Sequence, residues 1–110
     1  MKTYVLCIDK DPSAKEVYNT LLDYKFYYAK DLLEGYKILE KHKKINTIII
    51  DDLIDNPIVV FQQLKRKYKE KKILLITEKK EQITVIKMDE ILNLIEPPFD
   101  LESVKKKLDH

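Results

Sequence analysis

Short apolar runs alternate with longer amphipathic stretches along the whole sequence. The runs are rich in Ile, Leu, Val and aromatic residues and end at polar groups, which predicts five β-strands at 3–8, 26–29, 45–50, 71–77 and 91–95. Between them, apolar residues recur every three or four positions, which predicts helices at 12–23, 32–43, 57–68 and 100–108. The stretch at 78–88 contains several β-branched residues, so it predicts only a short or irregular helix.

The run from Ile45 to Ile50 is the strongest of these signals. Its Ile residues have no helical spacing, which is typical of a central parallel strand that is buried on both faces. Parallel neighbours need crossover helices between them, and these crossovers are right-handed. The series therefore predicts an α/β fold, a doubly wound five-stranded parallel sheet in the order 2-1-3-4-5.

Polar residues stand at the ends of three predicted strands. Asp9 follows the first strand, Asp51 and Asp52 follow the third, and Thr77 ends the fourth. These strands are neighbours in the predicted order, so their polar groups converge on the C-terminal edge of the sheet, where such folds bind ligands. The alternative is structural, because an Asp after a strand is also a common turn starter and helix cap.

Composition predicts one globular domain spanning residues 1–110. Apolar residues make up 45% and charged residues 36%, and the single cysteine, Cys7, lies inside an apolar run, which predicts a buried structural thiol. No apolar run is long enough for a membrane span, and the sequence starts without a signal peptide, so we expect a cytoplasmic protein with no membrane contact. The net charge of +2 predicts no nucleic-acid partner.

Two further features concern the surface and the packing. The only glycine, Gly35, falls inside a predicted helix, where glycine costs about 1 kcal/mol relative to alanine, so we expect close packing against a neighbour there. The basic stretch Lys65–Lys72 could attract an acidic partner, although a solvated helix end explains it equally well.

The order of these motifs resembles a response-regulator receiver domain of two-component signalling, a flavodoxin-like (βα)5 fold, over essentially the whole chain. The resemblance is carried by four segments: Val5–Pro12, Ile48–Asp51, Leu74–Thr77 and Pro98–Glu102. It implies that Asp51 accepts a phosphoryl group as an aspartyl phosphate, that Asp9 and Asp51 hold Mg²⁺, and that the Thr77 hydroxyl binds the phosphoryl oxygens. Asp11 and Asp52 are further candidate ligands of Mg²⁺.

The sequence departs from the receiver pattern at four places. Lys10 replaces the second acid of the first loop, Pro97 replaces the lysine before the closing Pro-Phe pair, and Leu94 replaces the aromatic switch residue. The loop after Asp51 is about two residues shorter than the resemblance implies. We hypothesise that the Lys10 ammonium lies beside Asp51 as a fixed counter-ion where Mg²⁺ would bind. The alternative is that Lys10 points to solvent.

These departures favour a non-enzymatic signalling module over the alternatives. The favoured interpretation is an atypical stand-alone receiver, or pseudo-receiver, that binds a protein partner through its fourth helix, fifth strand and fifth helix, with weak or no phosphorylation. The alternative is a working phosphoacceptor that a histidine kinase phosphorylates on Asp51 with Mg²⁺. The expected partner is a histidine kinase or a downstream signalling protein, and a homodimer remains open. A generic α/β binding domain is a third interpretation.

Overall fold

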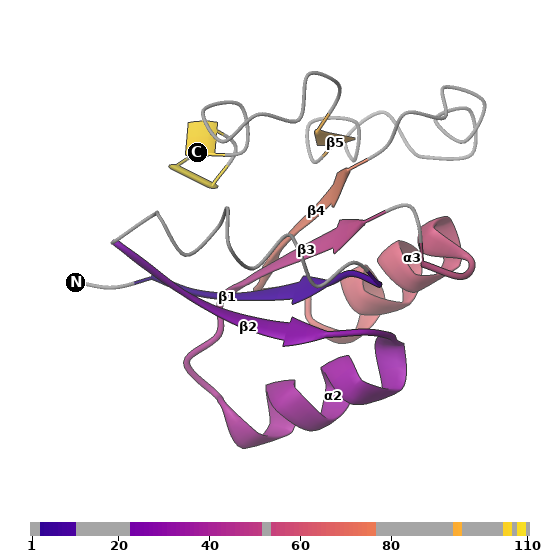
Figure 1. Cartoon of the computed structure of the whole chain (residues 1–110), viewed down its shortest axis with the longest axis horizontal. Coiled ribbons are helices and arrows are strands. Elements are labelled where there is room, and N and C mark those ends of the chain that lie inside the picture. The colour runs from indigo at the N-terminus through magenta and orange to yellow at the C-terminus, as the bar shows by residue number, and fades with distance from the viewer. Residues whose placement is uncertain are drawn as a thin grey trace.

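Five parallel strands form one sheet in the order β2-β1-β3-β4-β5 (Figure 1). The computed structural model describes residues 3–10, 23–51, 54–76, 94–95, 105–106 and 108–109. The strands are β1 (Thr3–Ile8), β2 (Tyr24–Ala29), β3 (Thr47–Asp51), β4 (Lys72–Ile76) and β5 (Leu94–Ile95). All four strand pairings are parallel, so the predicted fold class and strand order are confirmed.

Two helices, α2 (Leu32–Lys41) and α3 (Pro57–Lys67), cover the same face of the sheet (Figure 1). Both end slightly earlier than predicted, and β2 begins two residues earlier than predicted. The predicted helices at 12–23 and 78–88 lie outside the described residues, apart from Asp23, which lies in a turn. Of the predicted closing helix, residues 105–106 and 108 are described and are helical.

The core lies on both faces of β3, as the Ile run predicts. Ile48, Ile49 and Ile50 are all but fully buried, and successive residues point to opposite faces of the sheet. Ile48 and Ile50 join the cluster beneath α2 and α3, whereas Ile49 joins the cluster on the other face. Full burial of each such side chain contributes about 1.5–3 kcal/mol, so β3, like the similarly buried β1 and β4, stabilises the packing on both faces of the sheet.

Local sequence signals position α2 against β1. The Asp31 side chain caps the helix by accepting a hydrogen bond from the Glu34 backbone N–H at 2.9 Å. Gly35 is buried, and a Cβ added there would lie 3.2 Å from Cδ1 of Ile8. The predicted close packing at Gly35 is therefore confirmed, and the neighbour is the C-terminal end of β1.

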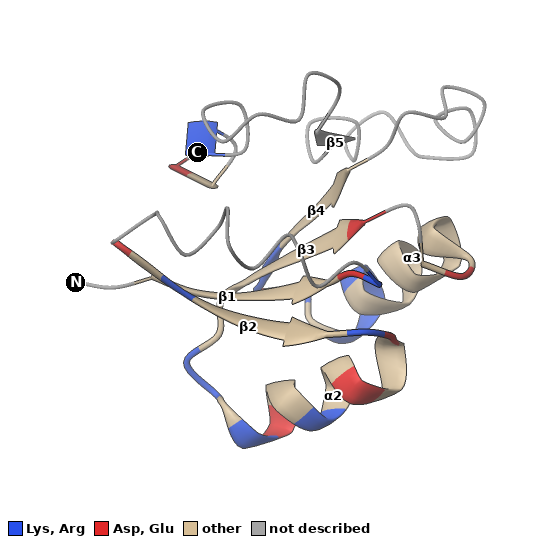
Figure 2. Cartoon of the chain, viewed as in Figure 1, with Lys and Arg blue, Asp and Glu red and all other residues tan. Residues whose placement is uncertain are grey.

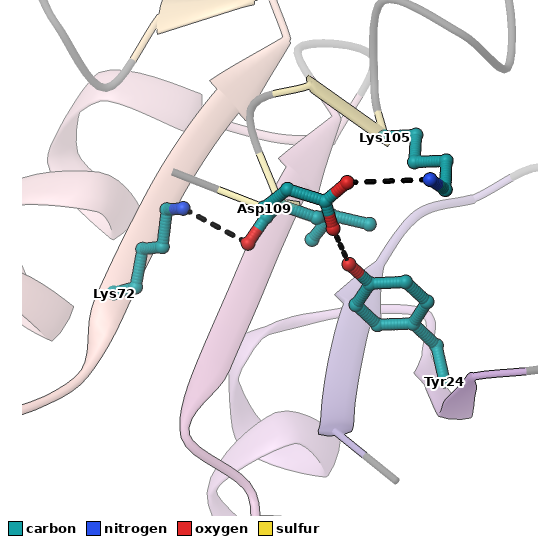
Figure 3. A network of polar contacts seen from close by, with 5 residues as sticks. Tyr24, Lys72, Lys105 and Asp109 are labelled. Atoms are coloured by element: carbon teal, nitrogen blue, oxygen red, sulfur yellow. Dashed lines mark hydrogen bonds and ion pairs between the residues drawn. The ribbon is translucent and has the colours of Figure 1, made fainter. Parts of the chain in front are cut away.

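The C-terminal segment contacts the opposite face of the sheet (Figure 3). Leu108 is buried in the second cluster, and its carbonyl oxygen accepts a hydrogen bond from Nζ of Lys72 at 3.1 Å. The Tyr24 hydroxyl donates to the Asp109 carboxylate, which also forms an ion pair with Lys105 at 3.3 Å. Burial, together with the Asp109 carboxylate, raises the pKa of Tyr24 to about 12. The last described residues are thus linked to β2 and β4.

Substitution of Gly35 tests the packing of α2 on β1. We expect Gly35→Val to lower the free energy of unfolding by about 2 kcal/mol or more, because the added methyl groups would overlap Ile8 and Leu6. Lys37→Val introduces the same β-branched side chain at an exposed position of α2 and should change stability by less than about 0.5 kcal/mol. Urea denaturation measures both, and equal losses would contradict close packing at Gly35.

The reactivity of Cys7 tests the burial of β1. Cys7 is a buried free thiol, as predicted, and burial together with the charge of Asp9 raises the pKa of this thiol well above its ordinary value. Because the thiolate is the reactive form, Ellman's reagent should modify native protein at least ~100-fold more slowly than protein in 6 M guanidinium chloride. Comparable rates in the two conditions would show that β1 opens readily to solvent.

Candidate functional site

The ends of β1 and β3 bring two carboxylates to the same edge of the sheet. Ile8 of β1 pairs with Ile50 of β3, and an aspartate follows each of them directly. Asp9 and Asp51 are both partly buried, whereas the residues before them are fully buried. The Asp9 backbone N–H donates to the Ala29 carbonyl oxygen at 2.9 Å, which fixes the chain at this point. Figure 2 shows acidic residues at these strand ends.

Three other candidates lie outside the described residues. Asp11 follows the end of the first described segment, Asp52 follows β3, and Thr77 follows β4. Asp51 pairs with Ile76, the last residue of β4. The structure thus places Asp9 and Asp51 on neighbouring strands, and the roles of Asp11, Asp52 and Thr77 stay predictions.

Lys10 has a different partner from the one that we predicted. Its Nζ lies 3.1 Å from a carboxylate oxygen of Asp55 in the loop before α3, rather than on Asp51. Asp55 follows Ile54, whose side chain is buried in the core and whose backbone N–H donates to the Asp51 carbonyl oxygen at 3.4 Å. These contacts hold Asp55 within reach of Lys10.

Asp55 is the residue of this site that sequence analysis missed. Its position immediately before Asn56 and Pro57 indicates only a helix start. Asn56 adopts a left-handed conformation with φ of 51°, a sharp reversal that directs the chain into α3. The sequence signal that points to Asp55 is the short loop after Asp51, because a shorter loop keeps its polar residues nearer to the strand ends.

A hollow of about 250 Å³ lies next to the Lys10–Asp55 pair, between the starts of α2 and α3. Its apolar walls come from Leu32, Leu33, Ile54 and Val60, and Lys30 and Asp31 complete the lining. Neither Asp9 nor Asp51 lines it. The hollow is therefore a separate feature from the two carboxylates, and a small molecule bound there would favour the generic binding-domain interpretation.

The donor set of the site is suited to a hydrated magnesium ion rather than to a fully protein-ligated one. Mg²⁺ keeps several waters and often takes only one or two carboxylates from the protein, which Asp9 and Asp51 would supply if they bound it. Among the residues with described positions, no group of three or more His, Cys, Asp or Glu side chains is placed to hold a metal. Lys10, directly after Asp9, adds a positive charge that opposes a dication.

Comparison with solved structures identifies the fold. The chain matches the chemotaxis response regulator CheY4 of Vibrio cholerae with a TM-score of 0.78 and 23% identity, over 99% of this chain and 98% of that one. It has the fold of a response-regulator receiver domain. The signal receiver domain of an HD domain-containing protein from Pseudomonas fluorescens Pf-5 has the same TM-score of 0.78 with 16% identity, over 100% of this chain and 97% of that one.

A third similar structure is a co-crystal of the histidine phosphotransfer protein Ypd1 and the receiver domain of the response regulator Ssk1 from Saccharomyces cerevisiae. The match to this structure has a TM-score of 0.73 and 17% identity, over 96% of this chain and 86% of that one.

No protein-family model and no curated protein matches the sequence. In the part of the receiver fold that the structure describes, no helix is long and apolar enough to cross a membrane.

A double-mutant cycle tests the contact between Lys10 and Asp55. The two side chains are 50% and 88% exposed, so solvent screens their attraction. We expect a coupling energy below about 1 kcal/mol from the Lys10→Ala, Asp55→Ala and double variants, falling further in 1 M salt. Urea denaturation gives the three stabilities. A coupling well above that limit would show that the pair is shielded from water.

Proposed function

We propose that this single domain of 110 residues is an atypical receiver that signals by binding a protein partner, with weak or no phosphorylation. The observation that carries the proposal is the juxtaposition of Asp9 and Asp51 at neighbouring strand ends, with a lysine in the position after Asp9. The carboxylates retain the position of a phosphoacceptor site in the receiver fold. Lys10 gives that edge a cation, paired with Asp55, in place of a further acidic ligand.

Lys10 weakens this site even though it contacts Asp55. Lys10 directly follows Asp9 in the sequence, so its positive charge would repel a dication bound beside Asp9. A lysine side chain also has no oxygen atom that could act as a metal ligand at this position of the loop. Without the metal, the negative oxygens of an incoming phosphoryl group would meet two carboxylates with less compensation. Binding of a partner without phosphorylation does not require the groups of the receiver pattern that this sequence lacks.

A working phosphoacceptor is the second candidate, and the position of Asp51 favours it. In that reaction a carboxylate oxygen of Asp51 would attack the phosphorus of a phosphohistidine, a P–O bond would form, and the bond to the imidazole nitrogen would break. The imidazole would leave with the electron pair of that bond and take up a proton. Mg²⁺, held by Asp9 and Asp51, would supply charge compensation on the transferring group.

The partner we propose is a histidine kinase, a phosphotransfer protein or a downstream signalling protein. The co-crystal of Ypd1 with the receiver domain of Ssk1 shows that a receiver of this fold is recognised by a phosphotransfer protein, which supports this class of partner. We place the interaction in the cytoplasm, because a single buried thiol is compatible with a reducing compartment. A homodimer is an additional possibility that sedimentation would test.

Magnesium titration followed by NMR separates the two candidates. With Mg²⁺ raised to about 10 mM, we expect no saturable shift of the Asp9 and Asp51 amides in the wild-type protein. Lys10→Asp should create saturable shifts at both amides, because it replaces a cation with an oxygen ligand. Lys30→Asp makes the same change of charge at the end of β2 and serves as the matched control, with no shifts expected.

Saturable shifts in the wild-type protein would overturn the pseudo-receiver proposal. In that case, incubation with acetyl phosphate and Mg²⁺ should add the mass of one phosphoryl group to the wild-type protein and none to Asp51→Asn. Absence of shifts in both the wild type and Lys10→Asp would show instead that Asp9 and Asp51 do not form a metal site at all.

A further inference from the structure

Basic residues are concentrated at the end of the sheet opposite to Asp9 and Asp51 (Figure 2). This basic end consists of Lys25 of β2, residues 40–44 at the end of α2, and residues 65–71 at the end of α3. It contains nine Lys and Arg residues and two Glu residues, a formal charge of +7. The whole chain carries only +2, so the remaining residues are net negative.

Folding brings the two lysine-rich segments together. The Lys72 backbone N–H donates to the Asn46 carbonyl oxygen at 2.9 Å, and the Lys71 ammonium donates to the Ile45 carbonyl oxygen. Nearer the helices, Nζ of Lys67 on α3 lies 4.4 Å from the ring centre of Tyr36 on α2. The segments therefore form one continuous surface, although 20 or more positions separate them in the sequence.

Favourable interactions with the helix dipoles explain the position of only some of these cations. Lys41 and Lys65–Lys67 lie in the last turns of α2 and α3, where cations are favourable. Lys43, Lys44, Lys69 and Lys71 follow the helices and gain little from the dipole, which acts within the last turn. Neither ion pair among the described residues involves the basic end. Its nine cations outnumber the acidic residues described at this end, Glu40, Glu70 and Asp23, so their mutual repulsion is only partly offset.

Aromatic rings beneath the lysines are already covered by cations or by another ring. Nζ of Lys44 lies 6.0 Å from the ring centre of Tyr4, and Nζ of Lys71 lies 5.6 Å from that of Tyr68. The rings of Tyr27 and His42 stack at 4.3 Å. Nucleic-acid bases bind single-strand proteins by stacking on open aromatic faces, and bidentate contacts to phosphate need arginine. These rings are engaged, and Arg66 is the only arginine in the sequence.

We propose that the basic end binds an acidic polypeptide segment, a run of Asp and Glu residues on a partner protein. Ammonium groups are compact point charges that pair with single carboxylates, and the segment would supply the missing compensation. This surface lies at the end of the strands away from the candidate acceptor site, so the inference does not depend on whether Asp51 is phosphorylated.

Binding of a labelled deca-glutamate peptide tests the proposal. Fluorescence anisotropy at 50 mM salt should show saturable binding to the wild-type protein, and 0.5 M salt should abolish it. Lys43→Glu/Lys69→Glu should weaken binding about tenfold, because it reverses two exposed charges on this surface. Lys30→Glu/Lys106→Glu makes the same change of net charge elsewhere, at two exposed lysines, and should leave the affinity within about twofold.

Three results would overturn the proposal. Equal weakening by the two double variants would show that the peptide responds only to net charge. Tighter binding of a ten-nucleotide oligothymidylate than of the peptide would show that the surface prefers nucleic acid. Absence of peptide binding at 50 mM salt, with an unchanged circular dichroism spectrum, would show that the basic end is a solvated surface.

Discussion

The burial of β3 on both faces is the constraint on which the rest of this structure depends. Ile48 and Ile50 pack beneath the helices, and Ile49 packs on the opposite face, so no position along the middle of the strand can accept a charge. Asp51 is the first residue after them that is exposed enough to carry a charged carboxylate. The same holds for β1, where four buried residues precede Asp9. Burial of the core strands therefore determines where the two carboxylates lie.

The chemistry at this edge is determined by residues just beyond the strands. Two partly buried aspartates stand side by side in sequence register, and Lys10 extends to Asp55 over the loop before α3. The two carboxylates and the Lys10–Asp55 pair thus place charges of both signs at the same edge of the sheet.

Most of the fold was predictable because its signals are local. The Ile run identifies the central strand, the three-to-four-residue spacing of apolar positions identifies α2, and Gly35 indicates close packing that the structure places on Ile8. Each of these depends on spacing or on the absence of a side chain. The alternation of strands and helices predicts the parallel sheet, and the order 2-1-3-4-5 is one of two orders common in such sheets.

The partner of Lys10 and the basic end were not predictable in the same way. The contact with Asp55 depends on the burial of Ile54 and on the left-handed backbone of Asn56, and both arise from tertiary packing. For the basic stretch Lys65–Lys72 the sequence leaves an acidic partner and a solvated helix end equally open, because the proximity of this stretch to residues 40–44 arises only when β3 and β4 pair. Sequence patterns report the faces of single elements, not the surfaces that several elements share.

The separation of charge along the strands has a kinetic consequence. Among the described residues, the end where the strands begin is strongly basic, whereas Asp9, Asp51 and Asp55 lie where β1 and β3 end, so charge is unevenly distributed along the described part of the sheet. The electric field of such a charge distribution orients an approaching charged protein before the two molecules make contact. This orientation raises the association rate and makes that rate sensitive to ionic strength. A polyanion would then approach the basic end first, and a polycation would approach the opposite end of the strands.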